Sequence, residues 1–198
     1  MTLTELRTLV RTDLADTNAA AYRWDDAALD RHLKRAGAEY SLAAPRQMTM
    51  TLNTVAGSRE LDITVLTGRV NIESVEYPAG LEPRSIRRFS TWAERLTVED
   101  GPVPDGTPIR INFGVLHLLD DTGTTIPVAH YEVVATGAAA YAAIEWAAHA
   151  VNRVNSGDDA AGGYFRWGST RLAAFQSALW QLGQGRRLKT GKLFPTGS

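Results

Sequence analysis

The sequence predicts an α+β protein: a bundle of about four helices with an inserted small antiparallel β domain and an extended C-terminal tail. Near both ends of the chain, apolar residues recur at steps of three and four, which is the spacing of one helical face. In the middle, short alternating segments are separated by turns rich in glycine and proline. We therefore expect residues 1–46 and 120–184 to form the two halves of the bundle, 47–119 the β domain, and 185–198 the tail.

Two short amphipathic helices are expected in the N-terminal half. Thr2 and Glu5 have the spacing of a capping box, and the helix that they begin should end near Asp16. Asp25 has the position of an N-cap for the second helix, which Pro45 should stop. The polar segment between the two helices should be a loop.

The middle of the chain should form about five short strands with turns between them. Residues alternate between apolar and polar along each segment, and the GPVPDGTP sequence before the last one is a strong turn signal. The pattern favours a small antiparallel sheet or barrel. The expected strands are residues 48–53, 61–63, 70–77, 92–98 and 109–116.

The C-terminal half should contain two longer helices. Pro127 precedes an alanine-rich helix expected over residues 128–155. A last helix should begin near residues 158–161, and Gly183 and Gly185 should end it. Side chains this small allow helix axes to approach closely, so the alanine-rich helix is either central in the bundle or packed on a neighbouring subunit. Large apolar residues on the inner faces should anchor the core. The predicted core anchors are Trp24, Leu29, Leu33, Tyr141, Phe175 and Leu179.

Composition sets limits on the function. Of the 198 residues, 44% are hydrophobic and none is cysteine, which excludes disulfides, thiolate zinc sites and cysteine nucleophiles. No apolar run reaches the roughly 18 residues that a membrane helix needs, and no signal peptide is expected. Residues 153–198 carry seven basic and two acidic side chains, and the remainder carries 14 basic and 20 acidic. A mildly acidic body with a basic end suits the stacking of rings, or an arm that reaches a negative surface.

No residue pattern predicts catalysis, a metal or a cofactor. The four histidines, His32, His117, His130 and His149, lack the i, i+4 spacing of a zinc helix. There is no nucleophile elbow and no phosphate loop. The adjacent acidic pairs at residues 120–121 and 158–159 are better explained by interaction with helix N-termini than by paired catalysis. We expect no enzyme activity.

The order of elements, together with several local stretches, resembles the head-to-tail connector (adaptor, or head completion) proteins of tailed bacteriophages. The stretches are LVRTDLAD, YRWDDAALDRHLKRAGAEYS, STWAERL, TTIPVAHYEVVATGAAAYAAIEWA and FRWGSTRLAAFQSAL. The resemblance covers most of the chain and rests on the order of these stretches. The β insertion departs from the smallest, purely helical adaptors and is closer to the adaptors of short-tailed phages.

The resemblance implies a structural virion protein at the neck of the phage. It implies a homo-oligomeric ring, a dodecamer, that docks on the portal protein, joins the head to the tail or to the next connector (a stopper or neck protein), and surrounds the channel through which genomic DNA passes. Such a protein is assembled in the host cytoplasm and has no membrane partner. We expect the helices to form the inner ring and the β domain to lie outside it with higher disorder.

The basic C-terminal tail is the predicted portal-docking element. Extended, its residues 185–198 could span about 45 Å. Charged residues would guide the encounter, and an apolar anchor near the end would carry most of the binding energy. The predicted docking residues are Arg186, Arg187, Lys189, Lys192, Leu193, Phe194 and Pro195. The alternative is a nucleic-acid-binding module, in which the basic residues of the same tail contact phosphates with marked salt dependence.

Overall fold

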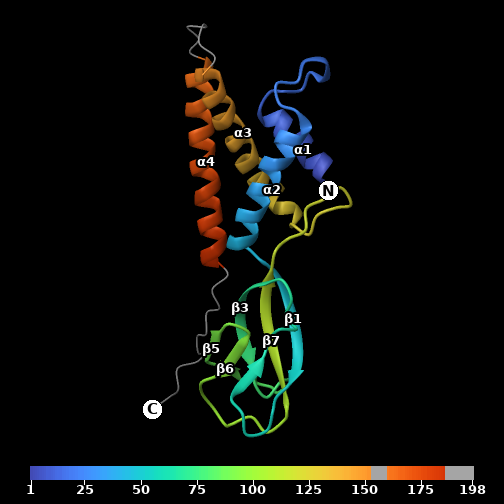
Figure 1. Cartoon of the computed structure of the whole chain (residues 1–198), viewed down its shortest axis with the longest axis vertical. Helices are drawn as coiled ribbons and strands as arrows, with labels where there is room; N and C mark the ends of the chain where they lie inside the picture. Colours follow the sequence, from blue (N-terminus) through green and yellow to red (C-terminus); the bar gives the residue numbers. More distant parts are fainter. Residues whose placement is uncertain (153–159, 186–198) are drawn as a thin grey trace. The chain divides into compact units, whose positions relative to one another are not determined.

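The computed structural model describes residues 1–152 and 160–185 and divides into two compact units (Figure 1). The helical unit contains residues 1–44 and the described residues after 116, and the β unit contains residues 45–116. The α+β prediction is confirmed: α-helices make up the first unit and antiparallel strands the second.

The β unit begins and ends a few residues earlier than residues 47 and 119. The segment after residue 116 belongs to the helical unit because it bonds to the end of the second helix. The His117 N–H donates to Ser41 Oγ at 3.1 Å, and the His117 Nε2 atom lies 3.0 Å from the Ala44 carbonyl oxygen.

Local signals in the sequence set the start of the first two helices, α1 (Leu3–Asp13) and α2 (Asp26–Ala43). The Thr2 N–H donates to Glu5 Oε2 at 2.8 Å, and Thr2 Oγ1 accepts the Glu5 N–H at 3.3 Å, so the capping box is present. At the start of α2, Asp25 Oδ1 accepts the Ala28 N–H at 2.6 Å. α1 ends before the expected Asp16 because the chain turns at Ala15, where φ is +52°.

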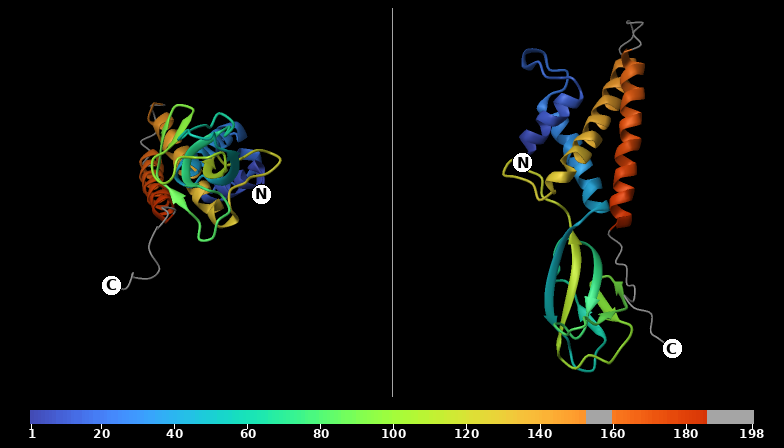
Figure 2. Two further views of the ribbon diagram at one scale, coloured as in Figure 1. Left: turned by 90° about the horizontal axis from the view of Figure 1, so that it is seen from below. Right: turned by 180° about the vertical axis from the view of Figure 1, so that it is seen from behind.

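The alanine-rich helix α3 (Tyr131–Asn152) is the central helix of the bundle. A single 3₁₀ turn, η2 (Val128–His130), leads into it after Pro127, and the last helix, α4 (Ala160–Gly185), follows it. α3 packs against α1, α2 and α4. Figure 2 shows α3 and α4 running side by side along most of their length.

Glycine makes the approach of α3 and α4 possible. A Cβ atom at Gly137 of α3 would lie 2.9 Å from the ring of Phe175, and one at Gly168 of α4 would lie 2.9 Å from Ile144 and 3.1 Å from the Ala140 carbonyl oxygen. Real Cβ atoms essentially never show contacts of 2.9 Å, so each helix presents a notch that the other one fills.

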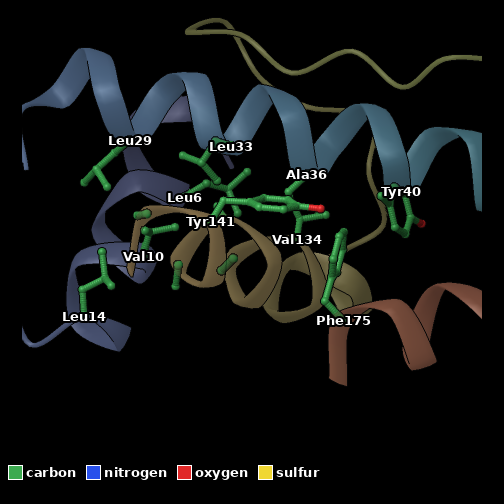
Figure 3. Packing of buried hydrophobic residues seen from close by; sticks show 14 of the residues in the cluster. Leu6, Val10, Leu14, Leu29, Leu33, Ala36, Tyr40, Val134, Tyr141 and Phe175 are labelled. Carbon is green, nitrogen blue, oxygen red and sulfur yellow. The ribbon is translucent and has the colours of Figure 1, made fainter. Parts of the chain in front are cut away.

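A single apolar core joins the four helices (Figure 3). Figure 3 shows side chains from α1 and α2 meeting those of α3, with Phe175 entering from α4. Leu6, Val10, Leu29 and Leu33 are among the fully enclosed residues. Alanines of α3 fill the centre, since larger side chains would push the neighbouring helices apart.

The β unit contains two antiparallel sheets that share one core. The four-stranded sheet has the order β1 (Arg46–Asn53), β7 (Pro108–Val115), β3 (Arg69–Glu76) and β4 (Ile86–Arg87). The three-stranded sheet has the order β2 (Glu60–Asp62), β6 (Arg95–Val98) and β5 (Phe89–Trp92).

Apolar residues from both sheets form this core. Leu61, Leu96 and Val98 of the three-stranded sheet and Ile109 and Ile111 of the four-stranded sheet belong to one buried cluster. The second apolar core is therefore separate from that of the helices.

The prediction of a single strand over residues 92–98 is wrong. The chain forms a hairpin there, in which Trp92 pairs with Arg95. Ala93 has φ of +48°, a left-handed conformation that ends β5 and starts the turn. Sequence alternation did not predict this break because no glycine or proline marks it.

Exchanging Gly168 for alanine should destabilise the helical unit. Overpacking costs about 1–3 kcal/mol, whereas the gain in helix propensity is at most about 1 kcal/mol. Gly163→Ala is a matched control in the same helix, because nothing lies within 4 Å of a Cβ atom there, and it should be neutral or stabilising. Urea unfolding followed by far-UV circular dichroism measures both; equal effects of the two substitutions would contradict the close approach.

Candidate assembly surface of the helical unit

The exposed side of α4 forms a surface with almost no charge, called here the outer α4 face. α4 is 26 residues long, and residues 172–185 contain no charged side chain. Arg166 is the one charged residue of the face, and Arg171, at its margin, approaches Asp13 at 3.7 Å. The face comprises Phe165, Arg166, Thr170, Ala173, Ala174, Gln176, Ser177, Trp180, Gln181 and Gln184.

The other surface helix provides a contrast within the same unit. The exposed side of α2 carries Arg31, Lys34 and Arg35, the charged composition that a solvated helix normally has. Since both helices cover the same core, the lack of charge on the outer α4 face is not a requirement of the bundle.

Two large aromatic side chains lie on the outer α4 face without cover. Trp180 is 67% exposed and Phe165 is 54% exposed. Phe165 also borders an apolar hollow of about 530 Å³ between α3 and α4. The other residues that line this hollow are Ile144, Ala147, Ala148, Ala161 and Gly162. An exposed tryptophan, and an exposed phenylalanine beside an apolar hollow, are typical of a surface that binds another protein.

An ion cluster holds α1 and α2 together at the N-terminal end of the unit. Arg11 donates to Asp16 Oδ2 and to Asp26 Oδ1, both at 2.6 Å. Arg7 donates to Asp26 Oδ2 and Asp30 Oδ1, both at 2.7 Å. The hydrogen bond from Arg11, followed by the charge of Arg7, lowers the pKa of the Asp26 carboxyl below its usual value. This cluster positions the two helices and the loop between them.

The same cluster fixes the loop before α2. The Arg11 guanidinium donates to the Trp24 carbonyl oxygen at 3.0 Å and lies 3.5 Å from the centre of the Tyr22 ring. Asp16 accepts the N–H groups of Arg23 at 2.8 Å and Trp24 at 3.4 Å. The role of Arg11 in fixing this loop could not be predicted from the sequence. An arginine on a short helix is expected on the solvated face, but Arg11 is buried.

An aromatic corner continues the cluster toward α3 and α4. Trp24 is 6% exposed and donates from Nε1 to the Ala142 carbonyl oxygen at 3.2 Å. Its ring lies 5.9 Å from that of Tyr164, which in turn lies 4.7 Å from Trp146, both edge to face. Arg23 covers Trp146 at 4.6 Å. Residues of α3, of α4 and of the loop before α2 therefore pack together at this end of the bundle.

Five of the six predicted core anchors are buried, and one is not. Trp24, Leu29, Leu33, Tyr141 and Phe175 belong to the helical core. Leu179 is only partly buried, because it lies at the edge of the α4 stripe and packs against the core from outside.

Tyr141 also has a polar contact. Its hydroxyl donates to Glu39 Oε2 at 2.7 Å, and burial together with this carboxylate raises the pKa of Tyr141 to about 12. Arg35 lies 3.8 Å from the centre of the Tyr141 ring. The contact ties α2 to α3 near the middle of the bundle.

The predicted portal-docking residues all lie outside the described residues. These are Arg186, Arg187, Lys189, Lys192, Leu193, Phe194 and Pro195. The acidic residues Asp158 and Asp159 lie outside them as well. The docking assignment therefore stays a prediction.

Three of the four histidines, His32, His117 and His130, have structural contacts. The Tyr40 hydroxyl and His130 Nδ1 are 2.6 Å apart, and His117 Nδ1 lies 3.1 Å from Thr125 Oγ1. His32 is buried near Glu145, and desolvation lowers its pKa. His149 is exposed on α3. In residues 1–152 and 160–185, no group of three or more histidine or acidic side chains could hold a metal ion.

Asp120 stabilises its own turn through its carboxylate, and its carbonyl oxygen accepts the N–H of Leu3, the first residue of α1, at 3.0 Å. The Asp120 Oδ1 atom accepts the N–H of Thr122 at 2.8 Å and that of Gly123 at 3.1 Å. These bonds lower the pKa of the Asp120 carboxyl. The expected interaction of this acidic pair with a helix N-terminus stays a prediction for the carboxylates.

No protein-family model and no curated protein matches this chain. Within the part of the chain that the structure describes, none of the helices has the length and apolar character needed to cross a bilayer. The candidate site thus rests on the geometry of the helical unit.

Replacing Arg11 with leucine should lower the free energy of unfolding by about 3–5 kcal/mol, because it leaves the buried Asp16 carboxylate without its charged partner. Arg31→Leu is the control: Arg31 also contacts a carboxylate, Glu145, at 2.5 Å, but at an exposed position. Its loss should cost less than about 1 kcal/mol. Thermal or urea unfolding of the helical signal compares the two, and similar losses would refute a special role for Arg11.

Proposed function

We propose that this protein is a structural virion protein of a tailed bacteriophage: an adaptor that forms a ring, docks on the portal protein and joins the head to the tail or to the next connector. The observation that carries the proposal is the outer α4 face, which has a single charged residue and exposes Trp180 and Phe165. A protein whose work is assembly needs such a surface, and an isolated domain does not.

The arrangement of the helical unit supports repeated assembly. A ring requires that one surface of each subunit meet a different surface of the next, and each subunit must keep its shape while this happens. The ion cluster, the aromatic corner and the close packing of α3 on α4 make the unit rigid. Rigid partners lose little conformational entropy on association, which favours a defined ring over irregular aggregates.

The resemblance in the sequence adds the identity of the partners. The order of two short helices, a β insertion, an alanine-rich helix and a last helix is that of the adaptor family, and in that family the ring has twelve subunits around the DNA channel. We propose the same dodecamer, neck location and portal partner for this chain. The tail is proposed to dock on the portal.

Two observations in solution distinguish this proposal from the nucleic-acid-binding alternative. The first is the molar mass of the full chain, alone and with its portal, by light scattering after size exclusion. The second is an electron micrograph of the mixture. Rings on the portal support the adaptor; a stable monomer that binds DNA tightly, and does not join the portal, supports the alternative.

Trp180→Glu should prevent or strongly weaken ring formation without unfolding the protein. Trp180 is exposed, so stability should change by no more than about 0.5 kcal/mol, whereas a buried interface tryptophan commonly contributes about 2 kcal/mol or more to binding. Lys34→Glu, on the charged side of α2, is the control and should assemble normally. Mass measurement with the portal detects the difference, and normal rings of Trp180→Glu would exclude the outer α4 face as an interface.

Deleting residues 186–198 should abolish or weaken docking on the portal while leaving contacts between subunits unchanged. The reason is that the proposed apolar anchor, Phe194, and the guiding charges lie in this segment. Affinity for the portal is measured with the full chain, with the truncated chain and with Phe194→Ala. Unchanged affinity after truncation would show that another surface docks.

A further inference from the structure

The strand β1 is a long and unprotected edge of the four-stranded sheet. It comes first in the strand order, and among residues 1–152 and 160–185 it pairs only with β7, in a register without interruption from Arg46 to Asn53. Residues 47–58 contain neither a charged residue nor a proline. The edges that β4, β2 and β5 form are only two to four residues long. Natural proteins usually protect a long edge strand with lysine, proline or a bulge, and β1 has none of these along its length.

Half of the backbone groups of β1 point away from β7. The Thr54 N–H donates to the Thr107 carbonyl oxygen, and these two residues continue the β1–β7 register. In an antiparallel pair, hydrogen-bonded positions alternate with positions whose groups point outward. The even-numbered residues of β1 therefore bond to β7, and the N–H and C=O groups of Gln47, Thr49, Thr51 and Asn53 point outward.

The side chains of β1 alternate between the two faces of the sheet, with polar side chains on one face and apolar side chains on the other. Thr49 Oγ1 donates to Asn112 Oδ1 at 2.7 Å on the polar face of the sheet, and Gln47 Nε2 donates to Glu73 at 2.8 Å on that face. Met48, Met50 and Leu52 lie on the opposite face, where Met50 and Leu52 pack at the margin of the β core. They are not fully covered, and Met48 is 39% exposed. An apolar row thus lies beside an open line of hydrogen-bonding groups.

We propose that β1 pairs in an antiparallel fashion with β1 of a second copy of this chain, around a two-fold axis beside Met50. In this register every outward N–H and C=O of the four odd-numbered residues finds a partner. Thr49 faces Thr51 of the second copy and Gln47 faces Asn53. The apolar row pairs with itself: Met50 lies opposite Met50 of the second copy, and Met48 lies opposite Leu52.

The sequence of β1 is self-complementary in this register. No shifted register pairs all the outward N–H and C=O groups of the four odd-numbered residues. Apolar residues occupy the pairs whose side chains are closest, and threonine or amide side chains occupy the hydrogen-bonded pairs. The single charged residue, Arg46, lies at the end of the strand, so the antiparallel arrangement keeps the two Arg46 side chains far apart. A parallel arrangement would bring like charges together. These features favour a second copy over an unrelated strand.

The inference goes beyond the proposed function and does not depend on it. The strand lies in the β unit, and its pairing uses backbone hydrogen bonds, whereas the proposed ring contact uses side chains of the outer α4 face. Trp180→Glu tests the ring contact and leaves β1 intact. Failure of one proposal is therefore distinguishable from failure of the other.

Cysteine cross-linking tests the register directly, because the chain has no cysteine of its own. In Met50→Cys, the two introduced residues would face each other with Cα atoms about 4.5 Å apart, within the range of a disulfide. In the matched variant Met48→Cys, the two cysteines would be offset by about 13 Å along the strands. Mild oxidation of the full chain should give a covalent dimer with Met50→Cys and little with Met48→Cys. A mixture of Met48→Cys and Leu52→Cys should cross-link again.

A charge pair at the axis provides a second measurement. Wild-type protein should show a concentration-dependent dimer in sedimentation equilibrium. Met50→Lys and Met50→Glu should each reduce it, because like charges meet at the axis, and an equimolar mixture of the two should restore it. Circular dichroism verifies that both variants are folded. Equal cross-linking of Met48→Cys and Met50→Cys, or no recovery in the mixture of folded variants, would overturn the proposal.

Discussion

The close approach of α3 and α4 is the constraint on which the helical unit depends. Gly137 accepts the ring of Phe175, and Gly168 accepts Ile144 and the backbone of α3. Because the two helices leave no room for larger side chains, α3 can lie in the centre with α1 and α2 on its other sides. The aromatic corner then closes the end of the same pair through Trp146 of α3 and Tyr164 of α4. The contact of α3 with α4 thus places the central helix, against which α1 and α2 pack.

The close packing of α3 on α4 separates the aromatic residues that the bundle requires from those that it does not. Phe175 and Tyr164 are required by the bundle, because they fill a notch and a corner that the glycines and alanines create. Trp180 and Phe165 fill nothing inside the unit and remain largely exposed. An apolar residue that stabilises no core is explained more simply by a partner. The outer α4 face is therefore defined by the residues of α4 that the core does not bury.

Much of the fold could be predicted from the sequence because its signals are local. The capping box at Thr2, the N-cap at Asp25 and the stripe through Phe175 each depend on residues within a few positions. The interactions that sequence reasoning missed join distant or irregular positions. Arg11 is buried only because the loop before Trp24 folds back on it, and the hairpin turn at Ala93 carries no glycine. The outer α4 face was missed because its residues lie between those of the inner stripe and become visible only once that stripe is buried.

The two proposed contacts differ in symmetry, and this difference determines what they build together. A helix face that meets another surface of its neighbour is heterologous, so it closes into a ring when the rotation allows. A strand that pairs with its own copy around a two-fold axis is isologous and joins only two chains. Subunits in a ring formed by the helical contact alone would keep β1 open. Pairing of these edges would then have one of two outcomes. It would link two rings, or it would join free subunits and dissociate when the ring forms. The first outcome doubles the mass of the assembled ring, and the second leaves dimers only in the unassembled pool, so the mass of the assembled ring and of the free protein separates them.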